Sequence, residues 1–436
     1  MPQDRGPGRP HLLRTLNDRL ALDLLLAGGP LTRRQVSDRT GLSRPTASLV
    51  LARLEAAGVV APVGVGVAGG RGPQATLYGV PADAVLGAAV DVGRDVVRAE
   101  VVDVRGAVAG TAQVARTTAP APSWRALREA LAVACADAGT TSDRLSHAVV
   151  GVGGAYDPRA DRLANSAHLP GWSGPRLAAG LERRLGLRVV VENDANLALC
   201  AERAVLRAAA DPRTTDGGAA PGGAADEDGG TALLWFGDGV GLAVEVGGRI
   251  HRGATGRAGE IGYVLAPAPF GDGRRDLQAL LGAGALEVLA AGYGLTTGGG
   301  PGGDDDGTGS GEGPDAHRVT RLLRDAVVLA RSETRGAGAR TFLGEAADLL
   351  AAALEPVTAV LDPATVVLGG PAGPAGGTFL ADLVTARLRD RGRWFGRVVP
   401  AAAPDAVLAG CREVCTALTR EVLLDRVAGG SEQVAT

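Results

Sequence analysis

Small polar and cationic side chains gather between residues 43 and 53, and a further arginine follows in a glycine-rich stretch. Arginine can bind a guanine edge or a phosphate through two parallel hydrogen bonds, and hydroxyl groups can bond to either. The chemistry that these residues support is hydrogen bonding to nucleic acid. Arg53 and Arg71 are expected to meet phosphates. The candidates for base or phosphate contacts are Ser43, Arg44, Thr46 and Ser48.

Such side chains need a helix-turn-helix to present them, and residues 31–60 predict one. Val36 and Leu42 flank the predicted turn and can pack against each other. Gly41 lies between them and permits a backbone angle that other residues resist. The sequence therefore predicts a short helix, a tight turn and a second helix.

The second helix is predicted to begin after Ser43, a residue type that caps helices, and Pro45 falls in its first turn. That N-terminal turn is the part of a recognition helix that meets base edges. Helical spacing predicts two faces. The outward face holds Arg44, Thr46 and Ala47, and the core-facing side holds Leu49, Val50 and Leu54.

A wing is predicted directly after this helix. Residues 58–60 begin an extended segment, residues 64–72 are rich in glycine and include Arg71, and residues 76–78 read as a returning strand. An arginine at such a tip can reach a phosphate or a minor groove. We interpret residues 11–80 as a winged helix-turn-helix that binds DNA; the alternative is a three-helix cap followed by a flexible linker.

Composition limits the rest of the chain. Its 436 residues are enough for two or three domains, and no apolar run approaches the length of a membrane span, so no membrane partner is expected. The first ten residues predict no signal peptide. Four cysteines make no disulfide framework, which favours a cytoplasmic location. Cys411 and Cys415 are interpreted as small core residues on one helix face rather than metal ligands.

The charge is distributed unevenly. Residues 1–80 contain ten arginines against five acidic residues, whereas the whole chain has a formal net charge of −3. The basic part coincides with the predicted helix-turn-helix, as attraction to phosphates requires. The chain has no lysine, and arginine suits bidentate contacts to guanine and phosphate.

From residue 85 onward, apolar strands alternate with helical segments, which indicates an α/β body over residues 85–425. Residues 85–92, 96–104 and 108–114 predict a strand meander. Residues 211–230 and 296–314, rich in glycine and aspartate, are predicted to be disordered surface loops.

Several motifs in this body resemble those of one family. They are Asp91-Val92-Gly93, Glu192-Asn193-Asp194-Ala195-Asn196, Gly237-Asp238-Gly239-Val240-Gly241, Ala258-Gly259-Glu260-Ile261-Gly262-Tyr263 and the Asp-Pro-Ala-Thr-Val-Val-Leu-Gly-Gly segment at residues 362–370. In order and spacing they resemble the ROK family of repressors and sugar kinases, over essentially residues 11–425. The resemblance implies an α/β chain in which a winged helix-turn-helix precedes a two-lobed actin-like ATPase fold. It also implies a cleft that holds a sugar, and ATP in the kinases.

The glycine turns depart from the kinase pattern. The family kinases carry Asp-x-Gly-Gly-Thr where this chain has Arg94 and Asp95 in the last two positions, and a Gly-Thr-Gly core where it has Asp238. Added carboxylates repel a triphosphate. We therefore expect no ATP cofactor and no catalytic residues.

The resemblance assigns the ligand contacts. Asp194 matches the catalytic base of the kinases and Glu260 a sugar-contacting glutamate, and Asn193 and Asp194 can alternatively cap the following helix. Tyr263 stands where the family has a histidine that serves sugar and zinc. No cysteine or histidine follows before Glu287, so no metal is expected. His168 takes the place of an asparagine, and Gln278 that of a second sugar-binding glutamate.

These observations predict a ROK-type regulator, expected to be a repressor, that binds a palindromic operator in double-stranded DNA as a homodimer or higher homo-oligomer. A sugar or sugar derivative is the expected effector. One alternative is a carbohydrate kinase with an accessory DNA-binding head. Another is a constitutive DNA-binding protein whose body no longer senses a ligand.

Overall fold

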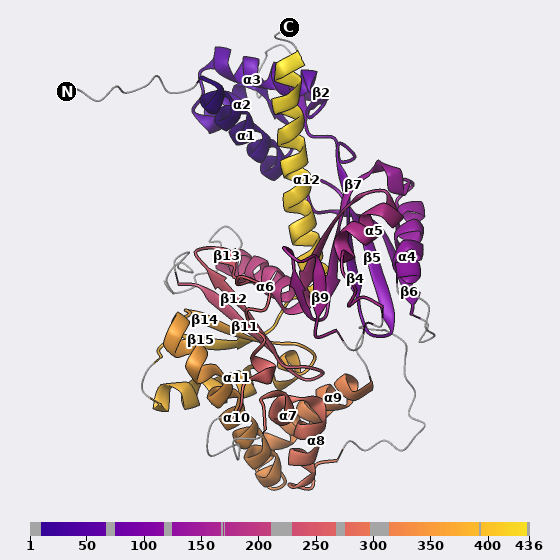
Figure 1. Ribbon diagram of the computed structural model, residues 1–436. Helices are drawn as coiled ribbons and strands as arrows, with labels where there is room; N and C mark the ends of the chain where they lie inside the picture. The colour runs from indigo at the N-terminus through magenta and orange to yellow at the C-terminus, as the bar shows by residue number, and fades with distance from the viewer. Residues whose placement is uncertain are drawn as a thin grey trace, which may run out of the picture.

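The computed structural model describes residues 10–66, 75–116, 124–166, 169, 171–210, 229–266, 275–296, 314–391 and 394–433 (Figure 1). Arg71 at the predicted wing tip and His168 lie outside the described residues, as do most of the two predicted loops at 211–230 and 296–314. Within the described residues, no helix has the length and apolar character needed to cross a membrane.

The N-terminal part is the predicted winged helix-turn-helix. Its sheet is antiparallel, with β3 between β1 and β2. The hairpin of β2 and β3 flanks the stretch where the wing tip was predicted. The elements are α1 (Pro10–Gly28), β1 (Leu31–Thr32), α2 (Arg33–Thr40), α3 (Arg44–Ala56), β2 (Ala61–Gly66) and β3 (Ala75–Gly79).

The residues that predict the turn between α2 and α3 adopt the expected conformations. Gly41 adopts a φ of 71°, in the left-handed region, and its N–H bonds to the Ser37 carbonyl at 3.0 Å. Ser43 caps α3, because its Oγ accepts the Thr46 N–H at 3.3 Å. Val36 is fully buried, and Leu42 packs against the same core. The predicted turn is confirmed.

The predicted faces of the second helix are wrong at two positions. Ala47 is fully buried rather than outward, and Leu49 is 62% exposed rather than core-facing. The small Ala47 side chain lies in the core cluster with Val50, Leu51 and Leu54, which lets α3 pack closely against the other helices. The apolar side chain of Leu49 is therefore presented on the surface of the helix.

The first lobe of the body is a five-stranded sheet with strand order β10-β7-β4-β5-β6. β4, β5 and β6 form the predicted antiparallel meander, and β7 and β10 add in parallel beyond β4. A two-stranded ribbon of β8 and β9 accompanies it. The elements are β4 (Leu86–Val92), β5 (Val96–Val102), β6 (Val108–Ala115), α4 (Trp124–Asp137), η1 (Ser142–Arg144), β7 (Leu145–Val152), β8 (Ala155–Asp157), β9 (Arg162–Ala164), α5 (Leu177–Leu185) and β10 (Arg188–Asn193).

The second lobe repeats this plan. Its strand order is β13-β12-β11-β14-β15, again an antiparallel meander with two strands added in parallel beyond the first. Its elements are α6 (Asp194–Ala210), β11 (Thr231–Trp235), β12 (Gly241–Val246), β13 (Arg249–Ile250), η3 (Ile261–Tyr263), α7 (Gln278–Leu281), α8 (Ala283–Ala291), α9 (Pro314–Ala330), α10 (Ala337–Leu361), β14 (Thr365–Gly369), α11 (Gly373–Asp390) and β15 (Arg397–Pro400). Two lobes with one topology confirm the expected actin-like body.

The last helix, α12 (Ala406–Gln433), joins the parts of the molecule. In Figure 1 it runs, in yellow, from the body to the N-terminal domain. Its first half packs against the first-lobe sheet and α6 through Val407, Cys411 and Cys415, which confirms the two cysteines as core residues. Its second half places Leu423 and Val427 in the core of the winged helix-turn-helix. The helix therefore continues past residue 425, where the body was predicted to end.

Candidate functional site

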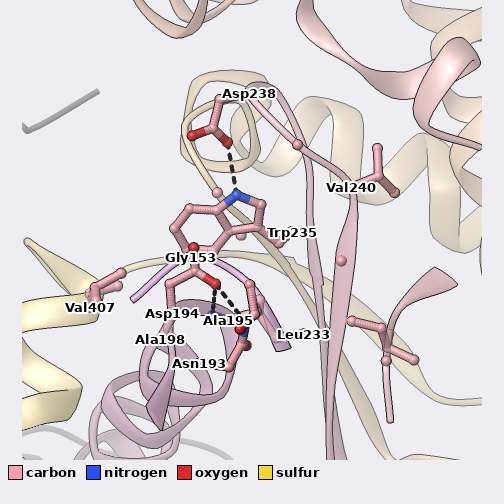
Figure 2. Close-up of a pocket in the computed structure, with 18 of the residues that line it drawn as sticks. Gly153, Asn193, Asp194, Ala195, Ala198, Leu233, Trp235, Asp238, Val240 and Val407 are labelled. Carbon is pink, nitrogen blue, oxygen red and sulfur yellow. Dashed lines mark hydrogen bonds between the residues drawn. The ribbon is translucent and has the colours of Figure 1, made fainter. Parts of the chain in front are cut away.

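A cavity of about 400 Å³ lies between the two lobes, as expected from the resemblance (Figure 2). The first lobe contributes the ends of β4, β7 and β10, and the second lobe contributes the turn between β11 and β12 and the end of β14. The first turn of α12 also lines the cavity, through Ala406 and Val407. A molecule in this cavity would therefore touch both lobes and the base of α12.

Asn193 and Asp194 lie where β10 ends and α6 begins. The Asn196 N–H bonds to Asn193 Oδ1 at 3.1 Å, and the Ala195 N–H bonds to Asp194 Oδ1 at 2.8 Å. The capping role is therefore present. Asp194 also lines the cavity, and its other carboxylate oxygen accepts no hydrogen bond from the described residues. One oxygen holds the helix and the second remains available to a ligand.

The pKa of Asp194 is raised to about 7, mainly by burial and next by the nearby carboxylate of Asp238, with smaller contributions from Asp91 and Glu260. The Ala195 N–H opposes this rise. A carboxyl group in such surroundings is close to half protonated at neutral pH. It can therefore both donate and accept a hydrogen bond near pH 7.

Replacing Asp194 with asparagine is expected to stabilise the protein more at pH 8 than at pH 5. The folded protein holds this proton more tightly than the unfolded chain, whose ordinary pKa is 3.8, so stability falls as pH rises from about 4 to 7. Asparagine keeps the cap and removes the buried charge. After allowance for partial solvent contact, the gain is about 2 kcal/mol, or a few degrees in Tm. Thermal melts of both proteins at pH 5 and pH 8 measure it, and an equal Tm difference at the two pH values contradicts it.

Glu260 meets a residue that the sequence did not single out. The Asn165 side-chain amide donates to Glu260 Oε2 at 2.6 Å, and both residues line the cavity. Asn165 follows β9 with a φ of 58°, a left-handed conformation that asparagine tolerates better than most residues. The sequence signal for Asn165 was weak, because a lone asparagine before a loop is common.

The other predicted ligand contacts differ in their positions. Tyr263 lies at the cavity with 63% of its surface exposed. Gln278 also lines the cavity, but its Oε1 accepts the Val240 N–H at 2.8 Å, so it holds the second glycine turn in place. His168 falls outside the described residues.

The end of the cavity nearest the glycine turns contains an ion-pair network that the sequence did not reveal. Arg98 donates to Asp91 at 2.7 Å and to Asp405 at 2.6 Å. Asp91 and Arg98 face each other on adjacent strands β4 and β5, whereas Asp405 directly precedes α12. The guanidinium therefore ties the first glycine turn to the segment that links the second lobe to α12.

The second glycine turn is also occupied by a side-chain pair. The Trp235 indole N–H donates to Asp238 Oδ1 at 2.9 Å, and Figure 2 shows the indole ring lying between Asp238 and Asp194. In the first turn, Arg94 lines the cavity, but Asp95 is not one of the lining residues. Of the two acids expected to repel a triphosphate, Asp238 lies at the cavity.

In the DNA-reading helix, the predicted contact residues lie on or near the first turns of α3. Ser43 and Arg44 are exposed, and Thr46 and Ser48 are half-buried. Arg53 is different, because its side chain forms an ion pair with the buried carboxylate of Asp18 in α1. Arg53 therefore links two helices through an ion pair, and its expected phosphate contact stays a prediction. Across the described residues, no group of three or more histidine, cysteine or acidic side chains is placed to hold a metal ion.

Comparison with known families gives two matches. The model described as the ROK family matches residues 87–214 and 224–405, and that described as winged helix-turn-helix DNA-binding matches residues 14–61. The xylose repressor of Bacillus subtilis (strain 168) is 22% identical over 255 residues, which make up 58% of this chain. That match spans 61% of the xylose repressor's own length.

Two solved structures share the fold. One is a ROK family transcriptional regulator described as a homolog of the E. coli MLC protein, with a TM-score of 0.66 and 16% identity. The match covers 96% of this chain and 99% of the regulator's chain. The ROK hexokinase from Thermus thermophilus has a TM-score of 0.54 and 24% identity, and it covers 77% of this chain and 100% of that one.

Proposed function

Since this chain belongs to the ROK family, we propose that it is a DNA-binding transcriptional regulator, a repressor, whose cleft senses a sugar or a related small molecule. The observation that carries the proposal is the joining of a capped recognition helix to a two-lobed cleft by the single helix α12. The likeness to a xylose repressor and to a ROK transcriptional regulator supports it. DNA as the partner places its activity in the cytoplasm.

The side-chain pairs at the two glycine turns, where a kinase would hold phosphates, support a regulatory function over a catalytic one. A kinase needs glycine turns whose N–H groups are open to phosphate oxygens. Here the Arg98 ion pairs lie at the first turn, and the Trp235–Asp238 pair lies at the second. A triphosphate at these turns would lie close to the carboxylate of Asp238, and the like charges would repel each other.

The coupling follows from α12. Ala406 and Val407 line the cavity, and Leu423 and Val427 lie in the core of the DNA-binding domain. The helix rises by about 30 Å between Val407 and Val427. A ligand that changes the closure of the two lobes moves the base of this helix, and the DNA-binding domain moves with it. The ligand thereby shifts the population between DNA-bound and free arrangements.

The expected DNA target is a palindrome read by two copies of the chain, one recognition helix per half-site. A single winged helix-turn-helix buries too little surface for tight specific binding, so a homodimer or higher homo-oligomer is the expected active form. Arg44 is the leading candidate for a base contact, since it is exposed in the first turn of α3.

Selection from random DNA duplexes tests this function directly. The purified protein is expected to enrich a palindromic sequence, and a member of a sugar panel is expected to change its affinity for that sequence. Enrichment is measured by sequencing and affinity by fluorescence anisotropy. Failure to enrich any sequence above the input would contradict the proposal.

The rival activity is tested with the same preparation. Incubation with ATP, Mg²⁺ and the sugar panel is expected to give no phosphoryl transfer. Measurable sugar phosphate would establish the kinase with an accessory DNA-binding head instead. A selected operator whose affinity no sugar changes, together with an unchanged Tm in every sugar, would favour a constitutive DNA-binding protein.

A further inference from the structure

The cavity between the lobes is lined by more acidic than basic side chains. Among the described residues, six carboxylates line it against two guanidinium groups; the carboxylates belong to Asp91, Asp194, Glu202, Asp238, Glu260 and Asp405, and the guanidinium groups to Arg94 and Arg98. A concave site with this excess carries a negative potential that attracts cations and repels phosphates.

Part of this acidic charge is satisfied internally. Arg98 forms ion pairs with both Asp91 and Asp405, and both oxygens of Glu202 accept backbone N–H groups from Ala402 and Ala403. These four groups stabilise the protein and offer little to a ligand. The polar side chains at the first glycine turn are thus already bonded within the chain itself.

The remaining three carboxylates keep open acceptor atoms. Each uses one oxygen within the described residues: Asp194 toward Ala195 and Asn193, Asp238 toward Trp235, and Glu260 toward Asn165. Their second oxygens have no hydrogen-bond partner among the described residues, whereas the amides of Asn193 and Asn165 are already donating. The side-chain atoms of these residues that remain free to form hydrogen bonds are mainly acceptor oxygens. A complementary ligand is therefore rich in hydrogen-bond donors.

We propose that the effector of this cleft is a polyol that carries an amine, with its ammonium group bound at the open carboxylate oxygen of Asp194 and within the negative potential of Asp238 and Glu260. The inference rests on the proposed function and names the chemical class of its ligand. An ammonium group supplies three donors and a positive charge at the point where the open acceptors gather. Arg94 also lines the cavity, but it is exposed and belongs to the first glycine turn.

The pKa of Asp194 agrees with this assignment. Burial and the neighbouring carboxylates raise it to about 7 in the free protein, so the charged form is poorly solvated there. A bound cation would favour the charged form and lower that pKa. A phosphate group would add a further negative charge beside the same carboxylates and would be rejected.

Three hexoses that differ only at carbon 6 test the ligand class: glucose, 6-amino-6-deoxyglucose and glucose 6-phosphate. Isothermal titration at pH 7.5 is expected to show the amine binding at least tenfold more tightly than the alcohol, and the phosphate not binding. Glucosamine, with the amine at carbon 2, reports whether the position of the charge matters. Binding of the phosphate as tight as that of the amine, or no advantage of either amine over glucose, would overturn the inference.

Two variants localise the effect. Asp194→Asn keeps the helix cap and is expected to abolish the preference for the amine. Asp382→Asn removes the same charge from the exposed surface of α11 and is expected to preserve it. An unchanged preference in Asp194→Asn would place the ammonium elsewhere and contradict the assignment. Operator binding by the same preparations tests the regulator function separately. The proposed ligand class can therefore be contradicted while the proposed regulator function is supported.

Discussion

Replacing Arg44 with alanine is expected to weaken operator binding by about thirtyfold or more. Arg44 is exposed in the first turn of a helix whose cap is formed by Ser43. A bidentate contact from arginine to guanine contributes about 1–3 kcal/mol of discrimination against the wrong base. Because two copies would contact a palindrome, the substitution removes the contact from both half-sites. Fluorescence anisotropy against the selected operator measures the loss.

The salt dependence of the same variant separates two roles for Arg44. Loss of a base contact relaxes the preference at one position of each half-site, whereas loss of a phosphate contact weakens all sequences alike and lowers the salt slope by about one. Arg249→Ala removes an exposed arginine from β13 in the body and serves as the charge control. If Arg44→Ala keeps the affinity and sequence preference of the parent, α3 is not the recognition helix.

A second large effect is expected from Leu423→Ala in α12. Leu423 is fully buried in the core of the winged helix-turn-helix, although it lies at the opposite end of the chain. Truncation of a buried leucine to alanine costs about 2–5 kcal/mol. The loss falls on a small domain with little stability to spare. We expect amide exchange in α1 and α3 to accelerate and operator affinity to fall at least tenfold.

Hydrogen exchange measured by mass spectrometry locates the effect, and the protection of β4, β7 and β11 in the body should stay near that of the parent. Glu421→Ala, two positions earlier on α12 and exposed, is the matched control. Unchanged protection of α1 and α3 in Leu423→Ala would show that α12 does not stabilise the DNA-binding domain.

The sequence predicted best those features that depend on neighbouring residues. The cap at Ser43 and the left-handed turn at Gly41 are set by local chemistry and are confirmed. The strand meander follows from the short apolar runs of these segments. In contrast, the faces of α3 depend on which helices pack against it, and Ala47 and Leu49 are therefore exchanged relative to expectation.

Pairs that are distant in the sequence were not predictable. Arg53 meets Asp18, 35 positions away, and Arg98 meets Asp405, 307 positions away. Local pattern gives no information on such partners, because only the fold brings them together. Asp194 and Glu260 were identified by motif, and the structure places both at one cavity. Their expected contact with a ligand remains a prediction.

The packing of α12 also bears on how the protein is made. The recognition helix α3 is synthesised early, but the core beneath it includes Leu423 and Val427, which are among the last described residues to be translated. A nascent chain therefore carries a DNA-reading surface whose support is still missing. The core beneath that surface is complete only once α12 has packed against it. The residues of the cleft are therefore made before the DNA-binding domain has its full core. A chain whose synthesis stops before α12 would lack part of that core.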